Sequence, residues 1–223
     1  MLAQIIQPGS KEHKHALEYF DLSPAICQEV GEKIIGAYNQ ATPNDARNAA
    51  GTYAYLAAIR SLRDILCPEG WQPHREGNIE MVLPVSGDFA ITASSGDKNT
   101  GRDGRDPKTK NQKGSQTDAL ISKNQWWPPS GELFPEMESN DPPYDPDQTP
   151  TWFLLYHVDS INNETRMELS LPINIDIYTL RVDKWKTRII LPKVMFDGTP
   201  IKRTNQQELY SDFDIEIKRK VNE

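Results

Sequence analysis

Helical and strand-like apolar patterns are separated along this chain, with the helical patterns first and the strand patterns later. Residues 24–39 carry apolar side chains at the spacing of an amphipathic helix, and a longer alanine-rich helix is expected from about residue 43 to residue 66. Short runs typical of strands begin only after residue 77. Because strands and helices do not alternate, the sequence predicts an α+β fold, with an N-terminal helix pair packed on a mainly antiparallel sheet and with long polar loops.

Short apolar or alternating runs mark the expected strands. The predicted strands are 79–85, 89–93, 152–158, 166–171, 186–191 and 213–218. Turn-forming residues separate the first two runs and also the third and fourth, so each of these pairs is expected to be a hairpin. The run 152–158 is apolar at almost every position, which predicts a strand buried on both faces.

The length of 223 residues is sufficient for one large domain with its own core. Residues 1–22 are polar and irregular in pattern, and we expect them to be a flexible leader. The remaining residues 23–223 are expected to form a single α+β domain. Its expected parts are helices within 24–66, a sheet from 77–93 and 151–219, and long loops at 94–118 and 128–150.

Composition narrows the classes of protein to which the chain can belong. No apolar run has the ~18 residues that a bilayer-spanning helix needs, and the first residues lack the basic and apolar regions of a signal peptide. Two cysteines are too few for a disulfide framework. We therefore expect a cytoplasmic protein with no membrane contact. The net charge of −7 argues against broad non-specific binding to nucleic acid.

One segment, residues 96–114, departs from this acidic average, with six basic residues and three acidic ones. Its glycines permit tight turns whose backbone N–H groups can face a phosphate, and its cations can neutralise a phosphodiester backbone. Two tryptophans follow closely and are candidates for stacking on bases. The predicted ligand-binding residues are Lys98, Arg102, Arg105, Lys108, Lys110, Lys113, Trp126 and Trp127.

The leading interpretation is a non-enzymatic binding module without a cofactor. It would grip a phosphate-bearing ligand such as nucleic acid through residues 96–114, as an accessory subunit of a larger protein complex. The opposing interpretation is a solvated flexible loop whose charged side chains interact only with water. Gly96 and Gly101 have the glycine spacing of a P-loop, but Arg102-Asp103 replace the Lys-Ser/Thr pair that holds phosphate and magnesium, which excludes an NTPase of that type.

A first alternative function is a magnesium-dependent nuclease. Asp197 and Glu216 would hold Mg²⁺, and Lys218, on the same strand face as Glu216, would orient or activate a water molecule. An alternating edge strand over 213–218 explains the same residues without catalysis.

A second alternative function is a protein-interaction subunit. It would use residues 128–150, which contain seven prolines and six acidic residues but no basic one.

A second set of carboxylates is a candidate metal site. Asp88, Asp159 and Glu168 fall after a turn and on neighbouring predicted strands. Glu168 alternates with Arg166 and Ser170 on one strand face, and we interpret these residues as ordinary surface polarity rather than as metal ligands.

Overall fold

The computed structural model describes residues 3–125, 127 and 149–196. Its helices are α1 (Lys11–Tyr19), α2 (Pro24–Asn39), α3 (Ala49–Leu66), the single-turn 3₁₀ helix η1 (Cys67–Glu69) and α4 (Ser115–Asn124). Its strands are β1 (Gln4–Ile6), β2 (Gln72–Glu76), β3 (Ile79–Leu83), β4 (Ala90–Ser95), β5 (Thr151–Asp159), β6 (Glu164–Ile175), β7 (Val182–Ile190) and β8 (Val194–Met195).

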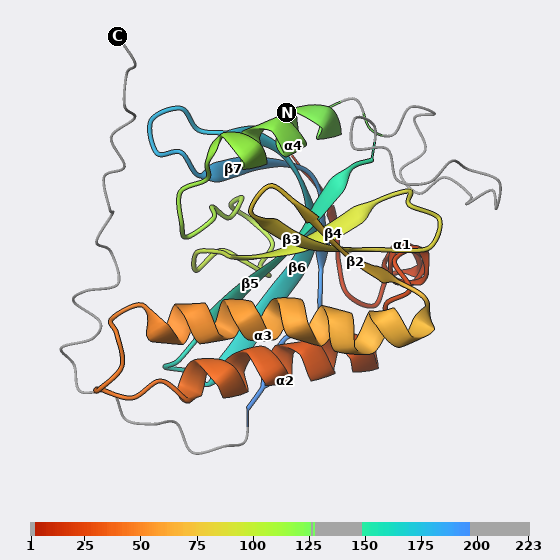
Figure 1. The fold of residues 1–223 in the computed structure, drawn as a ribbon. Helices are drawn as coiled ribbons and strands as arrows, with labels where there is room; N and C mark the ends of the chain where they lie inside the picture. The colour runs from red at the N-terminus through yellow and green to blue at the C-terminus, as the bar shows by residue number, and fades with distance from the viewer. Residues whose placement is uncertain (1–2, 126, 128–148, 197–223) are drawn as a thin grey trace, which may run out of the picture.

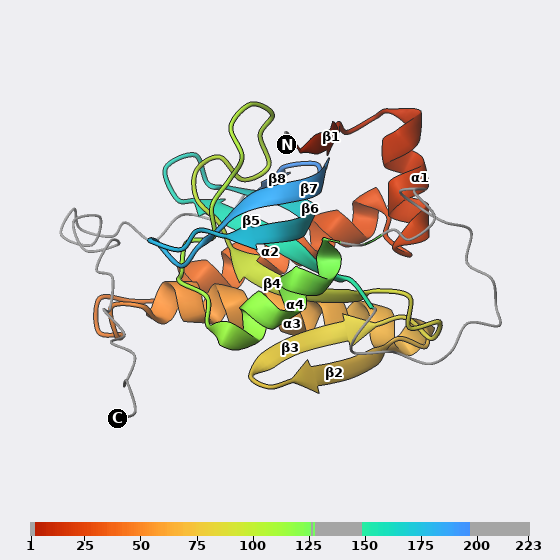
Figure 2. The same cartoon turned by 90° about the horizontal axis from the view of Figure 1, so that it is seen from above.

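The strands form one mixed sheet of eight strands in the order β1-β7-β6-β5-β4-β3-β2, with β8 paired to β6. The β1/β7 and β4/β5 pairs are parallel and the other pairs are antiparallel. Helices α2 and α3 pack together on one face of the sheet, and α4 covers the other face (Figure 1). Seen from above in Figure 2, α4 lies in front of the sheet and α2 and α3 lie behind it. The predicted α+β fold is confirmed.

Local chemistry explains where the two long helices begin. Helix α2 starts as the sequence predicts, because the Ser23 hydroxyl accepts a hydrogen bond from the Ile26 N–H at 3.2 Å and Pro24 occupies the first turn. Helix α3 starts later than expected, at Ala49. The Asp45 carboxylate accepts hydrogen bonds from the backbone N–H and the hydroxyl of Thr42, at 2.7 and 2.8 Å, which forms a local turn in place of a first helical turn.

The expectation of a flexible leader over residues 1–22 is wrong for the described part of that segment. Strand β1 extends the sheet beside β7, and α1 follows it. Ile6 and Phe20 are buried, and the Phe20 ring packs edge-on against Phe89 and Trp152. The few apolar residues of this segment are buried by contacts with strands that are distant in the sequence. The local pattern of apolar residues does not reveal such contacts.

The predicted strands and hairpins within the described residues are confirmed, with shifted ends. β3 pairs with β4 and β5 pairs with β6, both antiparallel. β2 was not expected, because its sequence Gln-Pro-His-Arg-Glu is polar and it lies at the edge of the sheet. Helix α4 occupies part of the expected loop 94–118, so the irregular part is residues 96–114. The expected strand 213–218 lies outside the described residues.

The two faces of the central strands differ in chemistry. Toward α2 and α3, alternate residues of β5 and β6 such as Leu154, Met167 and Leu169 join the main apolar core. Toward α4, β5 adds Phe153 and Leu155 to a smaller apolar cluster. On this second face β6 carries charged side chains instead, and residues 96–114 lie over them.

Candidate anion-binding loop

Residues 96–114, called the basic loop from here on, are tied to the sheet at both ends by backbone hydrogen bonds. The Gly96 N–H donates to the Tyr156 carbonyl at 2.8 Å, where the loop leaves β4. Where the loop returns, the Thr109 N–H donates to the Val182 carbonyl at 3.0 Å and the Lys110 N–H donates to the Ser95 carbonyl at 2.9 Å. Both ends of the loop are therefore hydrogen-bonded to regular strands, namely β4, β5 and β7.

A buried arginine on β6 holds the first half of the basic loop. The Arg166 guanidinium donates from Nε to the Thr100 carbonyl and from Nη2 to the Lys98 carbonyl, both at 3.2 Å. Its Nη1 lies 2.8 Å from a Glu164 carboxylate oxygen and 3.4 Å from one of Asp159. The two carboxylates balance the positive charge of the buried guanidinium, and the loop carbonyls accept hydrogen bonds from its other N–H groups.

A second buried ion pair joins β6 to β7 beneath the loop. Glu168 and Arg188 are both 0% exposed. Arg188 donates to both carboxylate oxygens of Glu168, from Nε at 3.0 Å and from Nη2 at 2.7 Å, the two-point geometry of a strong pair. Burial alone lowers the pKa of Arg188, but the hydrogen bonds and the charge of Glu168 raise it above its ordinary value.

The same pair also binds the loop backbone. The Gly101 N–H donates to Glu168 Oε2 at 2.9 Å, and Arg188 Nη2 donates to the Arg102 carbonyl at 2.8 Å. Gly101 has a φ of 68°, and a Cβ there would lie 2.8 Å from the Cβ of Arg166. Only glycine combines this backbone conformation with so close an approach to β6.

Further along, a tryptophan holds the second half of the loop. Trp185 Nε1 on β7 donates to the Pro107 carbonyl at 2.8 Å, and Trp185 is buried. The loop carbonyls at 98, 100, 102 and 107 are therefore all bound by side chains of β6 and β7. These contacts argue against the opposing interpretation, in which the segment is a solvated flexible loop.

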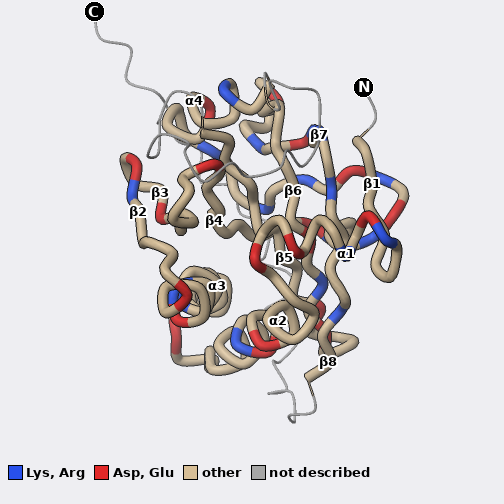
Figure 3. Tube along the Cα trace, turned by 90° about the vertical axis from the view of Figure 1, so that its right-hand side faces the viewer, with Lys and Arg blue, Asp and Glu red and all other residues tan. Residues whose placement is uncertain are grey.

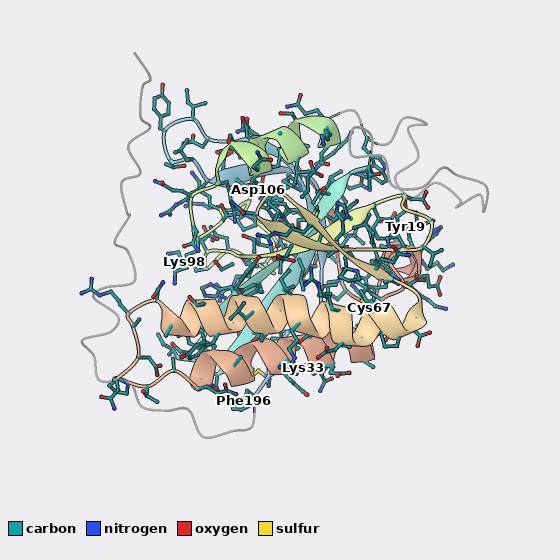
Figure 4. The ribbon with its side chains drawn as sticks, viewed as in Figure 1. Tyr19, Lys33, Cys67, Lys98, Asp106 and Phe196 are labelled. Carbon is teal, nitrogen blue, oxygen red and sulfur yellow. The ribbon has the colours of Figure 1, made fainter. Side chains whose placement is uncertain are left out.

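Five of the predicted ligand-binding side chains are exposed on this fixed backbone. They are Lys98, Arg102, Arg105, Lys108 and Lys110. None of them has an ion-pair partner within the described residues. Figure 4 shows Lys98 at the outer edge of the molecule, on the side away from α1. Basic and acidic positions are interspersed over the described chain (Figure 3), so the basic character belongs to the loop and not to a whole face.

Of the three other predicted ligand-binding residues, the structure describes Lys113 and Trp127, and neither is exposed to a ligand in the predicted way. Lys113 points inward, where its ammonium donates to the Ser94 hydroxyl at 2.7 Å and lies 5.8 Å from the centre of the Phe153 ring. Trp127 is only 7% exposed and packs edge-on against Trp152, so it offers no face to a base. Trp126 lies outside the described residues.

The inward position changes the chemistry of Lys113. Burial lowers its pKa to about 8. A lysine of this kind beside a serine hydroxyl is the arrangement of a base with a nucleophile. Ser94 is only 4% exposed beneath the loop, however, so a substrate does not reach its hydroxyl. We therefore assign Lys113 and Ser94 a packing role.

Reasoning from sequence missed the residues that hold the loop. The interpretation of Arg166, Glu168 and Ser170 as surface polarity is wrong, because all three are buried and the first two bind the basic loop. The available signal was local: Glu168 lies between Met167 and Leu169 on β6, and Arg188 directly precedes Ile189 and Ile190 on β7, so opposite charges stand beside apolar residues of two strands.

The other candidate sites have different outcomes. No group of three or more His, Cys, Asp or Glu side chains in the described part of the chain could hold a metal ion, so the set Asp88, Asp159 and Glu168 does not form a metal centre. The nuclease residues Asp197, Glu216 and Lys218 lie outside the described residues, as does most of segment 128–150.

Comparisons of this chain with protein-family models, with curated proteins and with solved structures give no match. Among the helices that the structure describes, none is both long and apolar enough to cross a bilayer.

Proposed function

We propose that this chain is a non-enzymatic binding module that grips the phosphate backbone of nucleic acid through the basic loop. The observation that supports the proposal is the combination of five exposed cations with a backbone fixed by buried ion pairs. A loop that is already ordered does not have to lose conformational entropy when a ligand binds, so its charges act at a lower cost than those of a flexible loop.

The internal use of the loop's acidic residues strengthens the proposal. Asp106 lies 3.4 Å from Arg188 Nη1, and Asp97 accepts a hydrogen bond from the Asn99 N–H at 2.9 Å. Both carboxylates are therefore engaged within the protein and are partly buried, which leaves Asp103 as the exposed acidic residue of the loop. The surface that a ligand meets is thus more basic than the count of six basic and three acidic residues suggests.

The overall charge sets the conditions under which binding is expected. A net charge of −7 repels a polyanion at long range, and salt screens this repulsion and the local attraction alike. Phosphate contacts also release counterions, so the affinity is expected to fall steeply as salt rises. Binding should therefore be sought at low ionic strength and followed as a function of salt.

The test is fluorescence anisotropy of the full chain with a labelled 20-nucleotide single strand and a duplex of the same length. The triple variant Lys98→Gln/Lys108→Gln/Lys110→Gln removes three exposed charges of the loop. The control variant Lys11→Gln/Lys14→Gln/Lys33→Gln removes three exposed charges from α1 and α2, so both variants have the same net charge.

The loop variant is expected to weaken binding on the order of a hundredfold at 50 mM salt and to lower the salt slope by about 2. The control variant is expected to bind like the unaltered chain. Equal losses in the two variants would show that only net charge matters, and an absence of salt-dependent binding to either oligonucleotide would refute the proposal.

Other parts of the original interpretation stay predictions. The nuclease and protein-interaction alternatives depend on residues outside the described part of the chain. The role as an accessory subunit concerns a partner complex on which the described residues give no observation.

A further inference from the structure

The tip of the β6–β7 hairpin presents an aromatic and an aliphatic side chain to solvent. Tyr178 is 88% exposed and Ile177 is 75% exposed. Large apolar side chains on a surface lose favourable burial, and two adjacent ones at a protruding tip are more informative than scattered ones. The core does not use either residue.

The tip is nonetheless held in one conformation. Asp176 Oδ1 accepts hydrogen bonds from the backbone N–H groups of Tyr178 at 3.2 Å and Thr179 at 2.7 Å. The Leu180 N–H donates to the Asp176 carbonyl at 2.8 Å, and Leu180 adopts a positive φ of 54°. The side chain of Asp176 thus builds the turn that displays Tyr178.

The tip adjoins the returning half of the basic loop. The Lys113 N–H donates to the Leu180 carbonyl at 2.7 Å. The Thr109 N–H, next to Lys108, donates to the Val182 carbonyl at 3.0 Å at the start of β7. The pKa of Asp176 is lowered, first by its hydrogen bonds from Thr179 and also by the charge of Lys108. The hairpin that displays Tyr178 therefore adjoins residues 109–113, the returning end of the basic loop.

We infer that the chain prefers single-stranded nucleic acid, with the basic loop on the phosphates and Tyr178 stacked on an unpaired base. An exposed aromatic ring beside cations suits a single strand, because its bases have free faces, whereas a duplex keeps its base faces stacked inside. Ile177 is placed to pack against the sugar or the edge of the same base. This inference rests on the proposed function and names its ligand class.

The experiment compares two single-stranded probes of equal length and charge, a 20-mer of thymidine and a 20-mer abasic deoxyribose phosphate. The variants are Tyr178→Ala and Tyr178→Phe. Ile161→Ala is the control, because Ile161 is an equally exposed apolar residue in the β5–β6 turn. The full chain is used throughout.

The unaltered chain is expected to bind the thymidine probe more tightly than the abasic probe. Tyr178→Ala should weaken binding of the thymidine probe about tenfold or more and leave binding of the abasic probe and the salt slope unchanged. Tyr178→Phe, which keeps the aromatic face, should bind within about twofold of the unaltered chain, as should Ile161→Ala.

Outcomes that overturn the inference are distinct from those that overturn the proposed function. Equal effects of Tyr178→Ala on both probes, or no effect on either, refute base stacking. If the loop triple variant still loses binding in that case, the phosphate-gripping function stands without the aromatic contact. If the unaltered chain binds neither probe, both proposals fail.

Discussion

The two faces of the central sheet are covered by different means. Helices α2 and α3 cover one face with apolar side chains, and the basic loop covers part of the other face through buried charges and backbone hydrogen bonds. Apolar packing is non-directional and follows from composition and periodicity. The polar cover depends on the position of single atoms, so it is more sensitive to substitution and harder to recognise in a sequence.

The largest expected effect is the loss of charge at the buried pair. Glu168→Gln removes the carboxylate that balances Arg188, and both positions are fully buried. We expect the free energy of unfolding to fall by about 3–5 kcal/mol, because the buried guanidinium keeps only the more distant, partly exposed Asp106 carboxylate as a counter-charge. Urea denaturation measures this change.

A double-mutant cycle sharpens this prediction. Arg188→Met alone leaves the Glu168 carboxylate without its cation, whereas the combined variant leaves no fully buried charge and only the partly exposed Asp106 carboxylate loses a partner. The combined loss should therefore be smaller than the sum of the single losses. Additive losses, or a Glu168→Gln effect below about 1 kcal/mol, would contradict the structural account of the pair.

The close approach of the loop to β6 makes a second prediction. Gly101→Ala forces a left-handed conformation on a residue with a side chain and brings the Cβ within 2.8 Å of the Arg166 Cβ. We expect a loss of stability of about 2–3 kcal/mol and weaker binding by the displaced loop. Gly104→Ala has the same kind of strain from its φ of 109° but meets no atom within 4 Å, so it should cost about 1 kcal/mol. Equal costs would indicate that Gly101 does not contact β6.

The apolar face provides a third prediction from helix α2. A Cβ at Gly31 would lie 2.6 Å from Val194 Cγ2 and 3.1 Å from Met167 Cε. Gly31→Ala should therefore destabilise the protein by about 1–3 kcal/mol through overpacking. Gly36→Ala, in the same helix with open space around it, should instead stabilise it by up to about 1 kcal/mol. Thermal unfolding of the two variants tests whether α2 lies where the structure places it.

The smallest expected effect concerns Lys113 and pH. Its folded pKa of about 8 lies below its ordinary value of 10.5. Between these pH values the unfolded chain binds the extra proton, so the stability contributed by this residue is lowest below pH 8 and rises toward pH 10.5. Lys113→Met should lack this rise and be more stable at pH 7 by on the order of 1–3 kcal/mol.

The exposed loop residue Lys110 supplies the control. Lys110→Met should keep the dependence of stability on pH that the unaltered chain shows. If Lys113→Met destabilises the protein at pH 7 and keeps the same rise, the ammonium is not in the buried position beside Ser94.

Much of the fold follows from the sequence because its signals are local. The Ser23-Pro24 start of α2 and the apolar run of β5 need no knowledge of distant residues. The late start of α3 depends on the hydrogen-bonded turn between Asp45 and Thr42. Strand β1 forms because it pairs with β7, which is distant in the sequence. Helix and strand propensities do not reveal whether a local turn replaces a helical turn, or which distant strand a segment pairs with.

The sequence predicts the exposed cations of the candidate site but not the buried residues that hold the loop. The excess of Lys and Arg over residues 96–114 is visible in the sequence, and five of these cations are exposed. The inward turn of Lys113, the burial of Trp127 and the role of Arg166 follow from which sheet face the loop covers. Spacing in the sequence does not contain that information, and the display of Tyr178 by Asp176 is visible only once the hairpin register is known.

Amide hydrogen exchange of Gly101, followed by NMR in the ligand-free chain, separates a fixed loop from a solvated one. The hydrogen bond of its N–H to buried Glu168 predicts exchange slowed by several orders of magnitude, comparable with neighbouring amides of β6. Exchange at the rate of an unstructured peptide would mean that the cations are not held on a rigid backbone, and the account of this loop as a preformed anion-binding surface would be wrong.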